Sequence, residues 1–114
     1  MEYRVCRNNP APYNDLNGKI SLLGLGTMRL PLRDAADQTS IDEEKAQEIF
    51  DYAYAHGVNY FDTAYPYHGG MSEKFCGKAL AKYPRTSYHL ASKLPGWLLK
   101  CDEDVPRIFN EQLA

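Results

Sequence analysis

The chain has 114 residues, which is enough for one domain at most, and its hydrophobic content of 44% is usual for a soluble globular protein. The formal net charge of −2 gives no electrostatic basis for binding nucleic acid, and no apolar run is long enough to span a membrane. The amino terminus lacks the apolar core of a signal peptide and the three cysteines form no CxxC motif, so we expect reduced thiols and a cytoplasmic location.

Two short β-like runs open the chain, at residues 2–5 and 19–23. A long polar connection with two prolines separates them, which predicts a hairpin with an extended loop rather than a tight turn. The second run continues into the segment LLGLGTMRL, where Leu23 and Leu25 are the expected buried residues. The glycines of that segment allow the backbone to bend or to approach another group closely.

The first helix is expected after a polar loop at residues 30–40. Ser40 and Glu43 have the spacing of a capping box, which places the start of the helix at Ser40. The apolar stripe of this helix has helical spacing and consists of Ala46, Ile49, Phe50 and Ala53. Gly57 readily takes the left-handed conformation, so we expect the helix to end there.

A short strand over Val58–Phe61, closed by Asp62, is expected next, because β-branched and aromatic residues lie there between helix breakers. The loop Thr63–Gly70 follows, and Ser72 is the expected cap of a second helix that runs to about Lys82. The buried stripe of this helix is predicted to consist of Phe75, Cys76, Ala79 and Leu80.

Residues 87–92 predict a further strand, which Lys93 closes. A third helical pattern follows, with Pro106 in its first turn and aligned apolar residues at Val105, Ile108, Phe109 and Leu113. Strands and helices therefore alternate, an order that predicts an α/β fold with a parallel sheet and right-handed crossovers. No strand follows the last helix, so we expect residues 1–114 to be the N-terminal part of a larger domain.

Three titratable side chains, Asp62, Tyr67 and Lys93, are expected at or just beyond the carboxyl ends of strands. Because parallel strands end at one face of the sheet, the three can converge. A free tyrosine has a pKa near ~10, so it exchanges protons poorly at neutral pH unless a nearby ammonium stabilises its phenolate. A carboxylate paired with the lysine would hold that ammonium in place. Together the three predict a general acid that protonates an oxygen gaining negative charge.

Each of these residues also has a purely structural interpretation when it is taken alone. Asp62 could cap the loop or the next helix, Tyr67 could be a packing or surface residue, and Lys93 could be a solvated lysine. His68 has no partner at metal-ligand spacing, so we predict no metal site. Trp97 lies in a loop rich in helix breakers, where the sequence is equally compatible with a pocket wall and a loop anchor.

The segment GLGTM at residues 24–28 is not a dinucleotide-binding GxGxxG motif, because the third glycine is missing and no helix begins there. A Rossmann phosphate loop is therefore disfavoured. The segment instead provides a backbone that a ligand can approach closely, at the same face as Asp62.

The segment GVNYFDTAYPYHGGMSEKFCGKAL, at residues 57–80, resembles the signature of the aldo-keto reductase superfamily. LGLGTMRLP is similar to the first strand of that family's barrel, and ASKLP to its third strand with the catalytic lysine. The stretches AYPYHGG, SKLPGW and FNEQLA are similar to the bacterial and archaeal subgroup that carries a C-terminal ferredoxin-like segment with a 4Fe-4S cluster. The resemblance covers nearly the whole chain except residues 7–17.

This resemblance implies a (β/α)8 TIM barrel, of which the chain would hold the hairpin and about three βα units. It also implies binding of NADPH or NADH at the carboxyl face of the barrel and reduction of a small-molecule aldehyde or ketone. Tyr67 then corresponds to the general acid, with Lys93 and Asp62 lowering its pKa. The residues that match cofactor-binding or substrate-binding positions are Gly26, Thr27, Met28 and Asp62 for the cofactor and Trp97 for the substrate.

The family's fourth catalytic residue, a histidine, would lie beyond Ala114, as would the rest of the cofactor site and any iron–sulfur ligands. We therefore expect that the remainder of the barrel is required and that these residues alone are inactive. The alternative is a non-catalytic, nucleotide-binding or regulatory barrel fragment without turnover. The intact set of Asp62, Tyr67 and Lys93 favours the enzyme.

Overall fold

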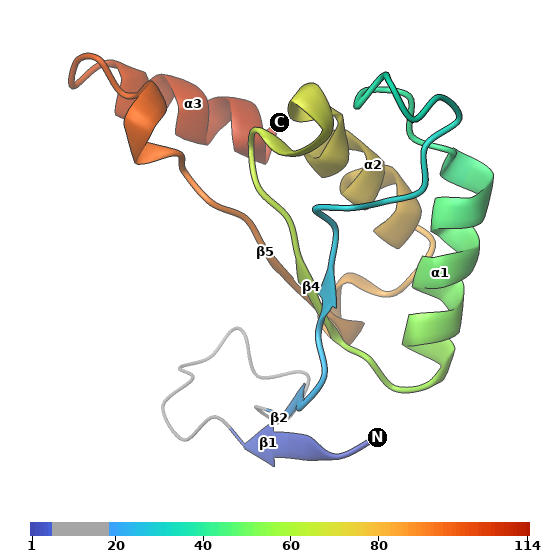
Figure 1. Cartoon of the computed structure of the whole chain (residues 1–114). Helices are drawn as coiled ribbons and strands as arrows, with labels where there is room; N and C mark the ends of the chain where they lie inside the picture. The colour runs from blue at the N-terminus through green and yellow to red at the C-terminus, as the bar shows by residue number, and fades with distance from the viewer. Residues whose placement is uncertain (6–18) are drawn as a thin grey trace.

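The computed structural model describes residues 1–5 and 19–114 and has an α/β arrangement (Figure 1). Strands β1 (Tyr3–Val5) and β2 (Lys19–Ser21) pair antiparallel, with Tyr3 opposite Ser21. This confirms the predicted pairing of the two runs, while their long connection lies outside the described residues.

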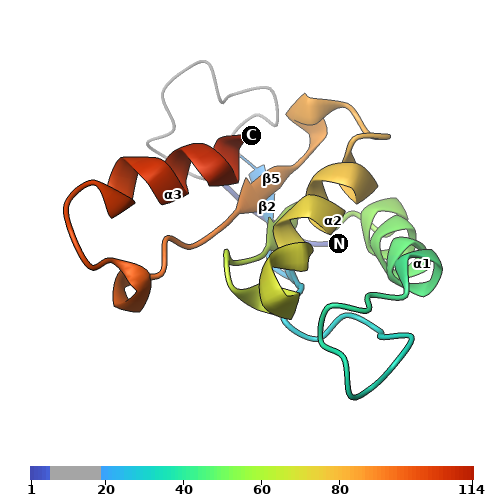
Figure 2. The ribbon, with the colours of Figure 1, turned by 90° about the horizontal axis from the view of Figure 1, so that it is seen from above.

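A second sheet contains three parallel strands in the order β3-β4-β5, which confirms the predicted parallel arrangement. These strands are β3 (Leu25–Gly26), β4 (Tyr60–Asp62) and β5 (His89–Ala91). The crossovers contain helices α1 (Glu43–Ala55) and α2 (Met71–Leu80), which lie together on one face of the sheet (Figures 1 and 2). Among the described residues the sheet is not closed, because β3 and β5 each have one neighbour only.

The hydrophobic core lies between this sheet and the two helices. Phe61 of β4 is fully buried and stacks on Phe50 of α1, with ring centroids 5.3 Å apart. Phe75 of α2 meets Phe50 edge-on at 5.4 Å, and Leu25 and Leu90 pack against the same cluster from the flanking strands. Because side chains alternate along a strand, the neighbouring residues of β3, β4 and β5 point to the opposite face, which no helix of residues 19–114 covers (Figures 1 and 2).

The junction between β2 and β3 differs from the prediction. Leu23 was expected to be buried, but its side chain is 63% exposed, and the chain forms no strand between Ser21 and Leu25. The Ser21 hydroxyl donates to the Leu23 carbonyl at 2.7 Å, which turns the backbone between the two sheets. The backbone passes close to Tyr60 at this bend, since a Cβ at Gly24 would lie 3.2 Å from the Tyr60 ring.

The start of α1 also differs from the predicted capping box. Asp42 is the N-cap, and its carboxylate accepts a hydrogen bond from the Lys45 amide at 3.3 Å. Ser40 instead donates to the carbonyls of Asp34 and Asp37, so it stabilises the preceding loop. At the other end, Gly57 has a φ of 90°, which confirms the expected termination of the helix.

Helix α2 buries all four residues of its predicted stripe, and each is less than a twentieth exposed. The predicted cap is wrong, however, because the helix begins at Met71 with Gly70 at the N-cap position. Ser72 lies within the first turn and is fully buried, so its hydroxyl is directed into the protein rather than to the helix end.

Helix α3 (Asp104–Leu113) has Pro106 in its first turn, as predicted. Of its aligned apolar residues only Ile108 is buried, whereas Val105, Phe109 and Leu113 are 42%, 51% and 70% exposed. One side of α3 is therefore apolar and uncovered. Within residues 1–5 and 19–114, no helix has the length and hydropathy needed to cross a membrane.

Candidate functional site

The candidate site lies at the carboxyl ends of the three parallel strands. Gly26, Asp62 and Ala91 occupy one register row across β3, β4 and β5. Lys93 follows two residues after Ala91, so strand alternation returns it to the face occupied by Asp62. Its ammonium donates to Asp62 Oδ2 at 2.7 Å and to the Thr63 carbonyl at 2.8 Å.

Tyr67 approaches the same ammonium from the loop after β4. It begins the 3₁₀ turn η1 (Tyr67–Gly70), and Lys93 Nζ lies 5.0 Å from the centre of its ring. Partial burial acts to lower the pKa of Lys93, but the hydrogen bond to Asp62 and the proximity of Tyr67 outweigh it, so this pKa lies above its ordinary value. The structure therefore brings together the three residues whose convergence was expected from their positions at strand ends.

The Lys93–Asp62 ion pair contributes little to stability, because the two side chains are 49% and 38% exposed. Pairs of this kind are worth about 0–1 kcal/mol. The arrangement instead has a chemical consequence. It holds an ammonium that is charged at neutral pH beside a phenol, and such a charge stabilises a phenolate left by proton transfer.

The segment Gly26–Met28 borders this group on the β3 side. A Cβ at Gly26 would meet no atom within 4 Å, and the Met28 side chain is 59% exposed, so the backbone here is open on the Asp62 face. Thr27 is fully buried, and its hydroxyl donates to the Asp62 carbonyl at 3.0 Å. The backbone of this segment is therefore accessible to a ligand bound beside the carboxylate and the ammonium.

A buried cluster of three hydroxyl groups, from Thr27, Thr63 and Ser72, is bonded to the backbone carbonyl of Asp62. Ser72 Oγ lies 2.9 Å from the hydroxyls of both Thr27 and Thr63. Because Thr27 donates to the Asp62 carbonyl, the consistent assignment has Ser72 donating to Thr27 and accepting from Thr63. Cys76 is buried beside these hydroxyls, and burial raises the pKa of its thiol. Sequence reasoning missed this cluster because its members have no common spacing.

His68 is a second residue whose position the sequence did not predict. Only 5% of it is exposed, and both ring nitrogens are bonded to the loop that follows Met28. The Leu30 amide donates to Nε2 at 3.1 Å, and Nδ1 lies 3.0 Å from the Gln38 carbonyl. Both ring nitrogens are therefore engaged in hydrogen bonds to the backbone. These contacts disfavour metal binding by His68, because neither nitrogen is left to act as a ligand.

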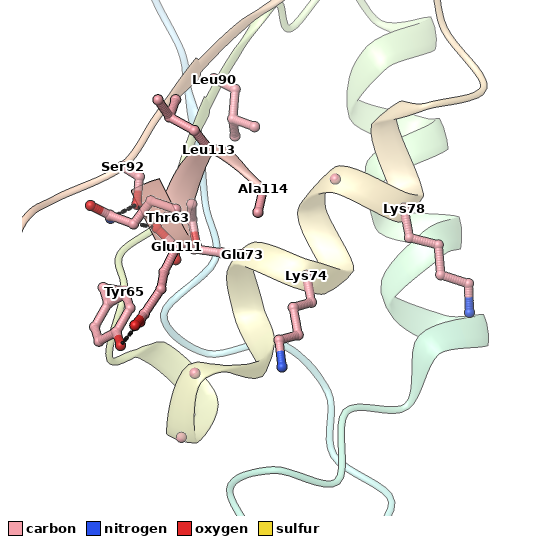
Figure 3. A pocket seen from close by; sticks show the side chains of 14 residues that line it. Thr63, Tyr65, Glu73, Lys74, Lys78, Leu90, Ser92, Glu111, Leu113 and Ala114 are labelled. Atoms are coloured by element: carbon pink, nitrogen blue, oxygen red, sulfur yellow. Dashed lines mark hydrogen bonds between the residues drawn. The ribbon is translucent and has the colours of Figure 1, made fainter. Parts of the chain in front are cut away.

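Helix α3 contacts the Lys93 backbone through Gln112. Its amide donates to the Lys93 carbonyl at 3.1 Å and to Glu73 Oε1 at 2.7 Å, and Ser92 also donates to Glu73. Figure 3 shows Glu73 and Ser92 together beside the end of α3. These contacts link the start of α2, the end of β5 and α3 around the residue before Lys93.

A cavity of about 930 Å³ opens between α2 and α3 and is drawn in Figure 3. It is lined by Leu90 and Ser92 rather than by Ala91 and Lys93, so it lies on the helix side of the sheet. It is therefore a space between helices and is distinct from the Asp62 face.

Trp97 is 76% exposed in the turn η3 (Gly96–Leu98), beyond the carboxyl end of β5. It contributes neither to the core nor to the Asp62–Lys93 contact. Within the part of the chain that the structure describes, no three His, Cys, Asp or Glu side chains are grouped as metal ligands.

Comparison with known proteins gives a consistent result. The model of the Aldo/keto reductase family matches residues 22–112. A Schizosaccharomyces pombe protein named as an aryl-alcohol dehydrogenase is 40% identical over 96 residues, which is 82% of this chain and 26% of that protein. The aldo-keto reductase dtxS3 of Metarhizium robertsii is 49% identical over 55 residues, which is 46% of this chain and 15% of that protein.

Among solved structures, the thermostable aldo-keto reductase Tm1743, determined with the inhibitor epalrestat, superimposes with a TM-score of 0.70 at 26% identity. The superposition covers 99% of this chain and 38% of that one. The parallel βα units thus match part of an aldo-keto reductase barrel. The chain spans about a quarter or less of the length of the curated relatives it matches.

Proposed function

The chain belongs to the aldo/keto reductase family, and on that premise we propose that it carries part of an active site for reducing an aldehyde or ketone. The observation that carries this proposal is the position of the Lys93 ammonium, 2.7 Å from Asp62 and 5.0 Å from the Tyr67 ring centre. The reaction needs a proton donor for the carbonyl oxygen, and this group of residues provides one.

In the proposed reaction Tyr67 donates its phenolic proton to the carbonyl oxygen, which gains negative charge as the carbon is reduced. A nicotinamide cofactor, NADPH or NADH, supplies the hydride when it is bound. Lys93 stabilises the phenolate that remains, and Asp62 holds the ammonium against the tyrosine. The products are an alcohol, the oxidised cofactor and a Tyr67 phenolate that must regain its proton from solvent or another group.

Gly26, Thr27, Met28 and Asp62 are the proposed cofactor-side residues. Because the Thr27 hydroxyl is used within the protein, this segment would contact the cofactor through its open backbone and through Met28. We assign Trp97 to the substrate side, since a large exposed aromatic residue beyond the strand ends suits a carbonyl compound with apolar parts.

The proposal concerns the intact gene product, with the remainder of the barrel in place. It includes a cytoplasmic location, in keeping with the free thiols of Cys76 and Cys101. Any iron–sulfur ligands would lie outside these 114 residues, and an iron and sulfide assay of the intact gene product tests that expectation.

Tyr67→Phe tests the proton donor directly. We expect the intact gene product to oxidise NADPH or NADH with members of an aldehyde and ketone panel, and the variant to lose about 10²- to 10⁴-fold in kcat. Cofactor binding, measured by fluorescence titration, should stay unchanged because the phenol is not needed to hold the nicotinamide. Tyr52→Phe is the matched control, since Tyr52 is 68% exposed on α1 and remote from Lys93.

Near-normal turnover of the Tyr67→Phe protein would remove Tyr67 from the proposed role. An intact gene product that binds NADPH but reduces no carbonyl would instead favour the regulatory, non-catalytic alternative.

A further inference from the structure

His68 is buried and unused by the proposed chemistry, yet its protonation state is determined by its contacts. The Gln38 carbonyl can only accept a hydrogen bond, so Nδ1 must carry a proton. The Leu30 amide can only donate, so Nε2 must be unprotonated. The imidazole is therefore neutral and in one tautomer, with one donor and one acceptor both used.

The backbone of His68 is held in an unusual conformation. Its φ of 53° and ψ of 42° lie in the left-handed region, and it is the one non-glycine residue with positive φ among residues 1–5 and 19–114. Such a conformation is unfavourable for a residue with a side chain. The two hydrogen bonds of the imidazole offset that cost, so the side chain keeps the turn in this shape.

The turn in question begins with Tyr67, the residue before His68. The loop that His68 binds extends from Met28 to Ile41, so it follows directly on the segment Gly26–Met28. The imidazole therefore connects the turn that carries the phenol to the loop that continues from the cofactor-side segment. Leu30 is 6% exposed, so the loop end of this connection is itself anchored in the core.

We propose that His68 is a positioning residue for Tyr67. The two hydrogen bonds of its neutral imidazole fix the position of the Tyr67 turn relative to the loop at residues 28–41. This inference rests on the proposed reductase function. In this role His68 acts through Tyr67, because both of its ring nitrogens are already bonded to backbone groups. Its effect is on the orientation of the phenol relative to Lys93, where a displacement of about 1 Å can cost about 10²-fold in rate.

The test uses the intact gene product and two variants with the same backbone cost. His68→Leu removes both hydrogen bonds, whereas His68→Gln keeps a side chain with one donor and one acceptor. We expect His68→Leu to lower kcat by about 10- to 100-fold while KM for the carbonyl and the cofactor Kd change by less than about 3-fold. His68→Gln should recover most of the lost kcat, and His56→Gln, at the exposed end of α1, should have no effect.

Nuclear magnetic resonance of the ¹⁵N-labelled histidines provides a readout that does not depend on activity. We expect the Nδ1–H tautomer for His68, and a shift of the Tyr67 ring signals in His68→Leu that is absent in His56→Gln. An Nε2–H tautomer, unshifted Tyr67 signals, or equal kcat losses in the leucine and glutamine variants would overturn the inference.

The experiment gives different results if the proposed reductase function is wrong and if the positioning role of His68 is wrong. An unaltered protein that reduces no carbonyl contradicts the reductase and with it the kinetic role of His68. The tautomer and the Tyr67 ring signals then still decide whether His68 holds the turn.

Discussion

Lys93 Nζ and Asp62 Oδ2 lie 2.7 Å apart at the carboxyl ends of neighbouring parallel strands, on the face of the sheet opposite α1 and α2. A second pair, Lys82 and Asp51, has the same 2.7 Å separation but joins the end of α2 to α1 on the helix side. The two pairs have the same separation and similar exposure. If removing the two carboxylates has different effects on activity, the cause is therefore the location of each pair in the fold.

The two ion pairs should have opposite effects when their carboxylates are removed. We expect Asp62→Asn to lower kcat of the intact gene product by about 10- to 100-fold with little change in unfolding free energy, since exposed pairs stabilise weakly. Asp51→Asn should leave kcat unchanged and cost about 1 kcal/mol, because Asp51 also accepts hydrogen bonds from Gln47 and Tyr83. Steady-state kinetics and urea unfolding of both variants measure this, and equal kcat losses would contradict it.

The contacts of Asp51 also predict a pH dependence of stability. Hydrogen bonds from Lys82 and then Tyr83 lower the pKa of Asp51 from 3.8 to about 2. A lowered carboxyl pKa stabilises the fold above the unfolded value and the effect disappears as the pH falls toward the folded value. The difference in stability between the unaltered protein and Asp51→Asn should therefore be full above about pH 4 and vanish between pH 4 and 2.

The contacts of Tyr83 predict a loss of stability at alkaline pH. Burial and then the hydrogen bond to Asp51 raise the pKa of Tyr83 from 10.0 to about 12. Because the neutral phenol is favoured in the fold, its contribution is full below about pH 10 and is lost as the pH rises toward 12. Tyr83→Phe should flatten this alkaline decline in urea midpoints, and an unchanged decline would show that other groups cause it.

The Ser72 hydroxyl should be important for stability although Ser72 is not a cap. Ser72→Ala leaves the buried Thr63 hydroxyl without its oxygen acceptor and should cost about 1–3 kcal/mol. Replacing both groups, in Ser72→Ala with Thr63→Val, should cost less than the sum of the single changes, because no unpaired hydroxyl then remains between them. Additive losses in urea unfolding would contradict the bond between the two hydroxyls.

A polypeptide of these 114 residues alone should neither unfold cooperatively nor reduce carbonyls. The outer edges of β3 and β5 lack partners among the described residues, and Phe109 and Leu113 of α3 are exposed. We expect a broad thermal transition, binding of a hydrophobic dye and self-association on a sizing column. A sharp, reversible melt of a monomer would show that the chain is independently stable.

Local patterns in the sequence were sufficient for the order of elements and for the convergence of the site. Apolar periodicity identified the buried stripe of α2, and alternating strands and helices indicated the parallel sheet. Parallel strands end at one face, so the positions of Asp62 and Lys93 at strand ends were enough to bring them together. The family resemblance rested on the same stretches.

The tertiary structure alone determined which groups the polar side chains bind. Ser40 and Ser72 both have sequence patterns typical of helix caps, but Ser40 binds the preceding loop and Ser72 binds Thr27 and Thr63. His68 likewise binds the backbone of Leu30 and Gln38, which lie 38 and 30 residues earlier in the chain. A hydrogen bond needs only one donor and one acceptor at the right distance, and this leaves no periodic trace in the sequence. Burial of an apolar face repeats along an element and does leave one, so the sequence determined the framework and the packing determined the polar connections.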